Sequence, residues 1–303
     1  MNILIHLPQS EFLPLENWEW PGVLVSDPLV AEALVIDPNV TLMKEQLDFY
    51  PELRVIVTAS TGTNHIDLAE CEMRGIKVLS LLDDREGLNA IKASSEFTFL
   101  LLLATLKNLK RGLNEVASGR WKANERLFRG RELAGKTVGF VGFGRIGQNV
   151  FKWCKAFDAI PLYIYDPRLV AGCKLEWVFG CDIVIICCSL TEETHGMIGF
   201  DLLNGLKEGA CLINTARGEV IVESDLVSVL LKRPDISIGL DVLSAEVFGS
   251  HLSSPLLKMS NVTVSPHMAG CTIESQHKAV LLAKRLLIRY TEEECYVNKK
   301  EIW

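Results

Sequence analysis

The chain has no excess of basic residues. Its 303 residues include 31 lysines and arginines but 38 aspartates and glutamates, which gives a net charge of −7 and a pI of about 5.5. Surfaces that bind nucleic acid or anionic membranes need basic stripes. The charge balance therefore argues against both kinds of partner, and the 49% of hydrophobic residues is typical of an ordinary soluble globular protein.

The sequence also lacks a membrane-length hydrophobic run and a signal peptide. Its most apolar stretch, residues 97–106, is about half as long as a membrane-spanning helix, and we expect a buried helix there. The N-terminus, M-N-I-L-I-H, lacks the basic start and the small-residue cleavage site of a secretory signal. We therefore expect a cytoplasmic protein that begins with a strand.

The cysteines form no metal-binding or redox pattern. Their number is odd, no C-x-x-C occurs, and neither they nor the six histidines show the spacing of a zinc site. We therefore expect reduced thiols and no bound metal. The nine cysteines are Cys71, Cys154, Cys173, Cys181, Cys187, Cys188, Cys211, Cys271 and Cys295.

Short β-rich runs alternate with helical stretches, and no internal repeat is present. Such alternation predicts parallel sheets with helices on both faces. In the first third of the chain, strands are expected at residues 3–6, 23–26, 33–36, 55–59 and 78–81. Helices are expected there at residues 42–49 and 68–74, and Gly75 ends the second as a C-cap glycine.

One long helix, residues 93–112, is expected to lead into a second series of elements. Its strands are expected at residues 137–141, 162–165, 183–187, 211–214, 236–240 and 262–264, and its helices at 146–157 and 223–232. A last helix, 273–290, is expected to return to the first domain. We predict an α/β fold with a smaller flavodoxin-like substrate domain, residues 1–92 completed by 274–303, and a Rossmann doubly wound parallel-sheet domain for the nucleotide, residues 93–273.

A Gly-rich turn, G-F-G-R-I-G, follows an expected strand and precedes an expected helix, and this context makes the motif informative. Gly142 permits the tight turn, and Gly144 lets the backbone approach a pyrophosphate. Gly147 lets the helix pack closely on the strand. The N–H groups near Arg145 and Ile146 are then placed to bind phosphate oxygens.

The next expected strand ends at Asp166, at the distance from the glycines where a dinucleotide site has an acid. A carboxylate there accepts hydrogen bonds from ribose hydroxyls and repels a 2′-phosphate, so NAD is the predicted cofactor and NADP the less favoured one. Arg168 weakens this preference. The alternative interpretation is a simple Asp166-Pro167 turn. The strand, the glycines, the helix and the acid follow one another at the spacing of a dinucleotide site, however, and this order favours dinucleotide binding.

Three further residues predict the chemistry. Arg217 lies in I-N-T-A-R-G-E-V-I, Glu246 in G-L-D-V-L-S-A-E and His267 in S-P-H-M-A-G. An arginine fork matches a carboxylate, and a histidine carries a proton near neutral pH. A carboxylate bonded to the imidazole orients it and favours its protonated form. Each residue alone is usually structural or solvated, but together they indicate reduction of a 2-keto acid.

Several stretches resemble the D-isomer-specific 2-hydroxyacid dehydrogenases, over nearly the whole chain and least before about residue 53. E-L-A-G-K-T-V-G-F-V-G-F-G-R-I-G is similar to the family's cofactor signature, and D-I-V-I-I-C-C-S-L-T-E-E-T-H-G-M-I to its adenine-side segment. L-K-E-G-A-C-L-I-N-T-A-R-G-E-V-I and S-N-V-T-V-S-P-H-M-A-G resemble its two catalytic stretches. T-G-T-N-H-I-D-L resembles its substrate loop.

The resemblance implies roles for five residues. Arg217 would bind and polarise the keto acid, His267 would be the acid/base, and Glu246 would support it. The backbone N–H groups of Thr61 and Gly62 would hold the substrate carboxylate from the other domain.

It also implies how the cofactor is held and how the enzyme is assembled. Asp241 would bind the nicotinamide carboxamide, with Thr215 and Ala216 lining the same end. A cleft would close between the two domains, and a homodimer would form through the nucleotide-binding domains.

The chain departs from the family pattern at four positions. Cys187 and Ser189 stand where His and Pro are usual, Val247 where a Pro usually follows the glutamate, and Val222 where Asp is common. None of these removes a chemical group from the mechanism, although Ser189 is expected to loosen the adenine pocket.

We therefore predict an NAD-dependent oxidoreductase that transfers hydride between NAD(H) and a D-2-hydroxy acid/2-keto acid pair. Two alternatives stay open: an NAD(H)-sensing protein similar to the corepressors with this fold, and a formate or phosphonate dehydrogenase. The T-G-T-N loop resembles that of some phosphoglycerate dehydrogenases, and Arg85 and Lys92 are nearby in sequence. A phosphorylated substrate thus stays open beside glyoxylate, hydroxypyruvate, D-lactate and longer keto acids.

Overall fold

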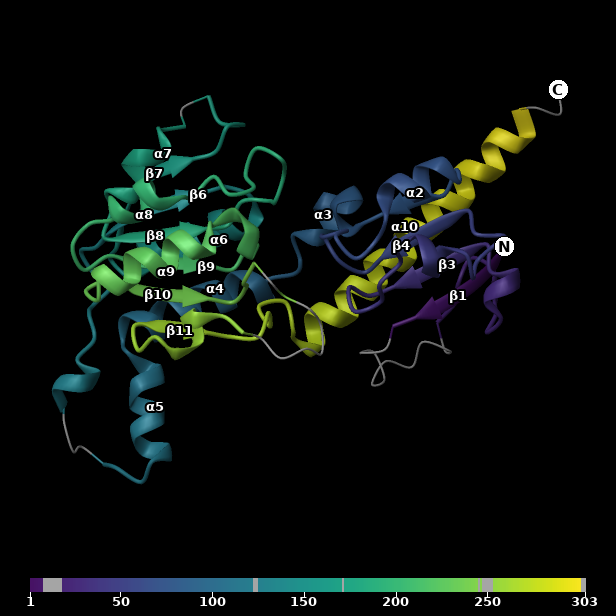
Figure 1. The fold of residues 1–303 in the computed structure, drawn as a ribbon. Helices are drawn as coiled ribbons and strands as arrows, with labels where there is room; N and C mark the ends of the chain where they lie inside the picture. The colour runs from purple at the N-terminus through teal and green to yellow at the C-terminus, as the bar shows by residue number, and fades with distance from the viewer. Residues whose placement is uncertain (8–17, 122–124, 171, 245, 247–252, 301–303) are drawn as a thin grey trace. The chain divides into compact units, whose positions relative to one another are not determined.

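The computed structural model describes residues 1–7, 18–121, 125–170, 172–244, 246 and 253–300 (Figure 1). They form two compact units. Unit 1 combines both ends of the chain, Met1–Ile91 and Thr272–Trp303, and unit 2 is the middle, Lys92–Cys271. Among the described helices, none is both long and apolar enough to cross a membrane.

Unit 1 contains a parallel sheet of five strands in the order β2-β1-β3-β4-β5. The strands are β1 (Asn2–His6), β2 (Val23–Leu24), β3 (Ala33–Ile36), β4 (Val55–Thr58) and β5 (Lys77–Leu79). Its helices are α1 (Lys44–Leu47), α2 (Leu68–Met73), α3 (Arg85–Leu88) and the long α10 (Ile273–Lys300). This strand order is the flavodoxin-like one, so the predicted fold of this unit is confirmed.

The sheet of unit 1 is covered on both faces. Along β4, Val55 and Val57 are fully buried in a cluster that includes Ala283 and Leu287 of α10. Ile56, between them, is buried on the other side with a cluster that includes Leu47 of α1. Successive strand side chains point to opposite faces, so an unbroken apolar run such as V-I-V belongs to a strand buried on both.

Unit 2 contains a parallel sheet of six strands in the order β11-β10-β9-β8-β6-β7. The strands are β6 (Thr137–Val141), β7 (Ile160–Tyr165), β8 (Ile183–Ile186), β9 (Cys211–Asn214), β10 (Ser237–Leu240) and β11 (Val262–Val264). Its helices are α4 (Ala93–Leu106), α5 (Leu109–Ala117), α6 (Arg145–Ala156), α7 (Leu175–Phe179), α8 (Phe200–Asn204) and α9 (Glu223–Lys232). The chain leaves β6 towards β7 on one side and later returns to β8 on the other. Beyond the carboxyl ends of such a pair, doubly wound sheets bind their ligands.

The two faces of this sheet have separate cores. Ile183 and Ile185 of β8 pack in a cluster with residues of α4 and α6. Val184 and Ile186 pack in a second cluster with residues of α7, α8 and α9. The doubly wound arrangement predicted from the sequence is thus confirmed.

The single helix expected at residues 93–112 is wrong. The chain forms two helices, α4 and α5, and Asn108 between them has a left-handed φ of 50°. Asparagine tolerates this conformation better than most residues, and the Asn108 side chain donates a hydrogen bond to the carbonyl of Arg129 (2.7 Å). The apolar residues of α4 lie on all sides of the helix, and no glycine or proline stands at the break, so the sequence pattern did not reveal the turn.

Candidate active site

The predicted residues of unit 2 lie where its strands end. Gly142 follows β6, Asp166 follows β7, Arg217 comes three residues after β9, and Asp241 follows β10. His267 comes three residues after β11. Because all six strands are parallel, their carboxyl ends share one edge of the sheet, and this edge carries the candidate site.

The Gly-rich turn is closely packed at Gly142 and Gly147 but open at Gly144. Gly142 has a φ of +89°, and a Cβ there would lie 2.7 Å from the Cα of Cys188. A Cβ on Gly147 would lie 2.8 Å from the carbonyl oxygen of Gly142. At Gly144 the nearest atom to such a Cβ belongs to Arg168, 3.9 Å away. Packing therefore requires glycine at positions 142 and 147, whereas Gly144 leaves room for a ligand.

Helix α6 begins at this turn without a capping side chain. Its N-cap is Gly144, and no side chain accepts a hydrogen bond there. The first N–H groups of a helix, together with its dipole, attract anions. The open glycine and the uncapped helix start fit the pyrophosphate of a dinucleotide.

Asp166 is almost completely buried, with 4% of its surface exposed. It accepts hydrogen bonds from the backbone N–H of Phe143 (2.8 Å) and from Nε and Nη2 of Arg168 (2.9 and 2.6 Å). The Arg168 bond, helped by Phe143 and opposed by burial, holds the Asp166 pKa well below its ordinary value. A fixed carboxylate therefore lies beside the Gly-rich turn, where it fits a ribose.

Arg217 is held by its own turn. The Asn214 side chain, 1% exposed, accepts from the N–H of Ala216 (2.9 Å) and donates to the carbonyl of Arg217 (2.9 Å). Nη1 of Arg217 donates to the Ala216 carbonyl (2.7 Å). The turn thus fixes the arginine backbone, and most of the guanidinium N–H groups stay available for an anion.

Thr215, predicted to line the nicotinamide end, is paired with a threonine of α4. The two hydroxyls of Thr98 and Thr215 lie 2.6 Å apart, and Thr98 also donates to the carbonyl of Ser94 (2.6 Å). Because Thr98 has one proton and uses it on Ser94, Thr215 must be the donor in the pair. The Thr215 oxygen then has lone pairs left to accept a hydrogen bond from a ligand.

His267 and Glu246 are in direct contact. Nδ1 of His267 lies 2.5 Å from Oε2 of Glu246, and the other carboxylate oxygen accepts from the N–H of Leu243 (2.6 Å). The Glu246 hydrogen bond raises the His267 pKa; burial and the charge of Arg217 lower it, and the charge of Asp241 raises it. The net effect is an imidazole that keeps its proton to higher pH than an ordinary histidine.

Asp241 holds the turn that carries His267. Only 1% of it is exposed, and its carboxylate accepts from the hydroxyl of Ser265 (2.6 Å) and from the N–H groups of Met268 (3.0 Å) and Ala269 (2.8 Å). Burial raises the Asp241 pKa, against these hydrogen bonds. His267 has a left-handed φ of 52°, a conformation that is uncommon outside glycine although histidine adopts it more often than most residues. The nicotinamide role of Asp241 stays a prediction, beside this structural role.

Thr61 and Gly62 belong to unit 1, in the loop that follows β4. The Ser60 hydroxyl donates to the carbonyl of Gly62 (2.6 Å) and lies 2.9 Å from the hydroxyl of Thr58. Within the described part of the chain, the N–H groups of Thr61 and Gly62 make no hydrogen bond. Two donors at the carboxyl edge of a parallel sheet fit an anion such as a carboxylate.

The two departures from the family pattern that border this edge have structural consequences. The Cys187 thiol is buried, and it donates to the carbonyl of Gly142 (3.0 Å); burial raises its pKa strongly. Val222 is the N-cap of α9, and its side chain cannot accept a capping hydrogen bond there. Val247 lies outside the described residues.

Three supporting residues were missed by the sequence prediction. Asn214 and Ser265 lie inside the two catalytic stretches, where a short polar side chain beside a turn was a usable signal. Thr98 had none, because its partner Thr215 is distant in the sequence.

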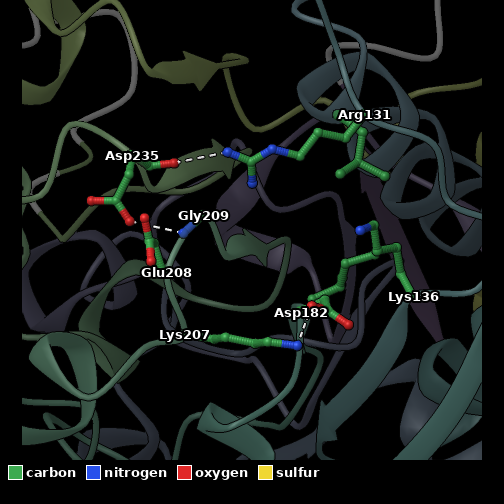
Figure 2. A pocket seen from close by; sticks show the side chains of 9 residues that line it. Arg131, Lys136, Asp182, Lys207, Glu208, Gly209 and Asp235 are labelled. Atoms are coloured by element: carbon green, nitrogen blue, oxygen red, sulfur yellow. Dashed lines mark hydrogen bonds and ion pairs between the residues drawn. The ribbon is translucent and has the colours of Figure 1, made fainter.

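A separate cavity of about 490 Å³ lies at the amino ends of the same strands. It is lined by Arg131, Lys136, Asp182, Lys207, Glu208 and Asp235, among others (Figure 2). Several of its charges are paired, for example Lys207 with Asp182 (2.6 Å). None of the predicted site residues is among those that line it, so this cavity and the candidate chemistry are at opposite edges of the sheet.

Comparison with known families gives two matches. Residues 99–269 match the NAD binding domain of the D-isomer specific 2-hydroxyacid dehydrogenases, and residues 23–85 match the catalytic domain of the same family.

Individual proteins agree with these matches. A glyoxylate reductase of Pyrococcus furiosus is 32% identical, over 98% of this chain and 93% of that protein. A glyoxylate reductase/hydroxypyruvate reductase of Mus musculus is 33% identical, over 78% of this chain and 73% of that protein. The crystal structure of a D-lactate dehydrogenase from Aquifex aeolicus, complexed with NAD and lactic acid, superimposes with a TM-score of 0.78 at 26% identity. It covers 98% of this chain and 97% of that one.

Proposed function

This chain belongs to the D-isomer-specific 2-hydroxyacid dehydrogenase family, and we propose that Arg217, Glu246 and His267 carry its chemistry. The chain is an NAD-dependent dehydrogenase that acts between 2-hydroxy and 2-keto acids. The observation that carries the residue assignment is the 2.5 Å hydrogen bond between His267 and Glu246, at the edge of the sheet where the nucleotide motif also ends.

In the reducing direction, bound NADH would supply the hydride for the carbonyl carbon. The Nδ1 proton of His267 is shared with Glu246, so Nε2 is the atom that gives its proton to the carbonyl oxygen. The Arg217 guanidinium stabilises the negative charge that develops on that oxygen. The hydroxy acid leaves with both hydrogens, and His267 is left neutral until solvent protonates it again.

The substrate proposed is a small 2-keto acid of the glyoxylate or hydroxypyruvate type, on the strength of the relatives' activities. The unbonded N–H groups of Thr61 and Gly62 are the proposed second anchor for its carboxylate. A phosphorylated keto acid is the rival substrate, and it would need a cation such as Arg85 or Lys92.

NAD is the proposed cofactor in preference to NADP. The support is the buried Asp166 carboxylate beside the Gly-rich turn, since a 2′-phosphate there would be repelled. Arg168 neutralises part of that charge (2.6 Å), so the preference is expected to be moderate. The ratio of kcat/KM for NADH to that for NADPH measures it, and a ratio at or below one would contradict this choice.

A homodimer in the cytoplasm is the proposed state of the protein. Helix α5 exposes Leu109, Leu113 and Val116, whose spacing puts them on one helical face, and Trp121 just beyond it is also exposed. A second copy of the chain would cover this apolar face. The eight cysteines among the described residues are all free, as suits a reducing compartment. Sedimentation of the protein and of Leu113→Glu tests the dimer.

The function is tested by following NADH oxidation with glyoxylate, hydroxypyruvate, pyruvate and 3-phosphohydroxypyruvate. We expect turnover that His267→Ala lowers by about 10²–10⁴-fold, the usual contribution of a positioned acid. His195→Ala removes an exposed imidazole of the same unit and serves as the control. Near-normal turnover by His267→Ala would show that the acid lies elsewhere.

A further inference from the structure

We propose that Glu223 is a positioning residue for the His267–Glu246 pair, because it binds Ser244 and Ser254, which flank Glu246 in the sequence. The proposal rests on the function given above. Glu223 is the first residue of α9, and none of the reacting groups touches it.

The two carboxylate oxygens of Glu223 bind two serines. Oε2 accepts from the hydroxyl of Ser244 (2.8 Å) and from its N–H (3.3 Å). Oε1 accepts from the hydroxyl of Ser254 (2.5 Å). Ser244 comes two residues before Glu246 and Ser254 eight residues after it. One side chain on a helix therefore joins two serines that lie on either side of Glu246 in the sequence.

The same segment is also where Glu246 is held. Its Oε1 accepts from the N–H of Leu243 (2.6 Å), the residue directly before Ser244. A side chain on Gly218 would overlap the backbone of Leu243 and Ser244, so this backbone lies directly against the residue after Arg217. Glu223 thus holds the backbone on which both the Glu246 carboxylate and the Arg217 turn depend.

A simpler explanation is that Glu223 only favours the positive end of the α9 dipole, as acids in a first helical turn do. Asp225 lies in the same turn and does this as well. Its Oδ2 accepts from the N–H of Phe200 (2.9 Å), in α8, and it makes no hydrogen bond to Ser244, Glu246 or Ser254, the described residues around Glu246 that bear on the proposal. The two acids therefore separate the proposal from the simpler explanation.

Loosening the segment should be visible in the titration of His267. The charged groups that act on this imidazole are Glu246 and Asp241, which raise its pKa, and Arg217, which lowers it. If Glu246 moves away, the pKa of His267 falls. Reduction needs the protonated imidazole, so its kcat/KM, which falls as pH rises through that pKa, would begin to fall at lower pH.

The test compares Glu223→Gln with Asp225→Asn. Each removes one negative charge from the same helical turn, but only the first removes an oxygen that accepts from a serine. For Glu223→Gln we expect kcat to fall about tenfold, a part of the ~10²–10⁴-fold acid contribution. The KM for NADH should stay constant, and the fall of kcat/KM with rising pH should begin at a lower pH. Asp225→Asn should leave both kcat and this pH dependence unchanged. Equal effects of the two variants would overturn the proposal.

Two further measurements make the result independent of the substrate. Ser244→Ala with Ser254→Ala should reproduce the Glu223→Gln effect, and adding Glu223→Gln to that double variant should change little, because all three act through one contact. Titration of the His267 imidazole by NMR, identified with His267→Ala, should give a lower pKa in Glu223→Gln and an unchanged one in Asp225→Asn. An unchanged pKa in both refutes the positioning role, whereas absent turnover in the parent enzyme refutes the proposed function alone.

Discussion

The two edges of the six-stranded sheet in unit 2 use charged side chains in different ways. At the amino edge, Asp182 pairs with Lys207 and Asp235 accepts from the N–H of Gly209, beside an open cavity (Figure 2). At the carboxyl edge, Asp166 and Asp241 are almost completely buried and bind backbone N–H groups of turns that carry predicted site residues. The strands are the same, so the difference comes from the segments that join them.

At the amino edge, Asp182 binds Lys207 (2.6 Å) and both the N–H and the hydroxyl of Thr137 (2.9 and 2.8 Å). Asp235 binds Arg233 (2.9 Å). The first pair joins the segments that precede the neighbouring strands β8 and β9, and the second lies within the segment that precedes β10. Exposed ion pairs contribute at most about 1 kcal/mol each, and these pairs serve the fold.

At the carboxyl edge, Asp241 holds the turn of His267, and Asp166 holds the Gly-rich turn through Phe143. Backbone with positive φ occurs at both edges, at Gly142 and His267 here and at Asp158 and Gly209 on the amino side, so φ alone does not distinguish them. What distinguishes the carboxyl edge is that its almost fully buried aspartates hold the turns that carry the predicted site residues.

The comparison predicts that loss of an arginine lowers activity at the carboxyl edge but not at the amino edge. Arg217→Gln should lower kcat/KM for the keto acid by about 10²–10³-fold, as loss of a charge-stabilising donor does. Arg131→Gln, at the amino edge, should leave kcat/KM unchanged. Steady-state kinetics with both variants measure this, and a large loss of activity in Arg131→Gln would put function at the amino edge.

A methyl group should be more costly at the Gly-rich turn than at a glycine outside it. Gly142 and Gly135 both have positive φ, but only at Gly142 would a Cβ meet neighbouring backbone. Gly135→Ala should cost about 1 kcal/mol for the left-handed conformation. Gly142→Ala should cost several kcal/mol and raise the KM for NADH. Urea unfolding and NADH titration check both, and equal losses would mean that packing below the turn is unimportant.

The ion pairs of the amino edge should affect stability and its pH dependence, and leave turnover unchanged. Burial acts to raise the pKa of Asp182, but the hydrogen bonds from Lys207 and Thr137 outweigh it and give a value of about 2. A lowered folded pKa stabilises the protein above the unfolded value, and this is lost as pH falls from about 4 towards 2. Asp182→Asn should therefore cost about 1–2 kcal/mol at pH 7. In urea unfolding, the difference in unfolding free energy between the parent protein and Asp182→Asn should become smaller below pH 4. A difference that does not depend on pH would show that the charge of the carboxylate is not its cause.

The smallest effect is expected at the start of α9, on the carboxyl edge. Unlike α6, this helix has no proposed ligand at its uncapped end, so a cap should stabilise it without loss of function. Val222→Ser should add about 0.5–1 kcal/mol and keep kcat/KM. Val227→Ser, inside the same helix, should destabilise it. Thermal unfolding checks the pair, and destabilisation by Val222→Ser would show that the valine packs better than a serine caps.

Some elements were predicted with the bounds they have in the structure. The strands expected at residues 33–36, 137–141, 211–214 and 262–264 are β3, β6, β9 and β11. Most of these residues are buried, and the β-branched, apolar runs of such strands are visible locally. The expected helix at 93–112 was wrong because one left-handed residue, Asn108, breaks it where the sequence has no glycine or proline.

The sequence by itself determined the family, the fold of each unit and three candidate reacting groups, because glycines, strands and catalytic stretches are local patterns. Only the tertiary structure revealed the contacts that join distant segments: Glu223 with Ser244 and Ser254, and Thr98 with Thr215. It also revealed the left-handed φ of His267. A hydrogen bond depends on where two segments meet in space, and no spacing along one chain encodes that meeting.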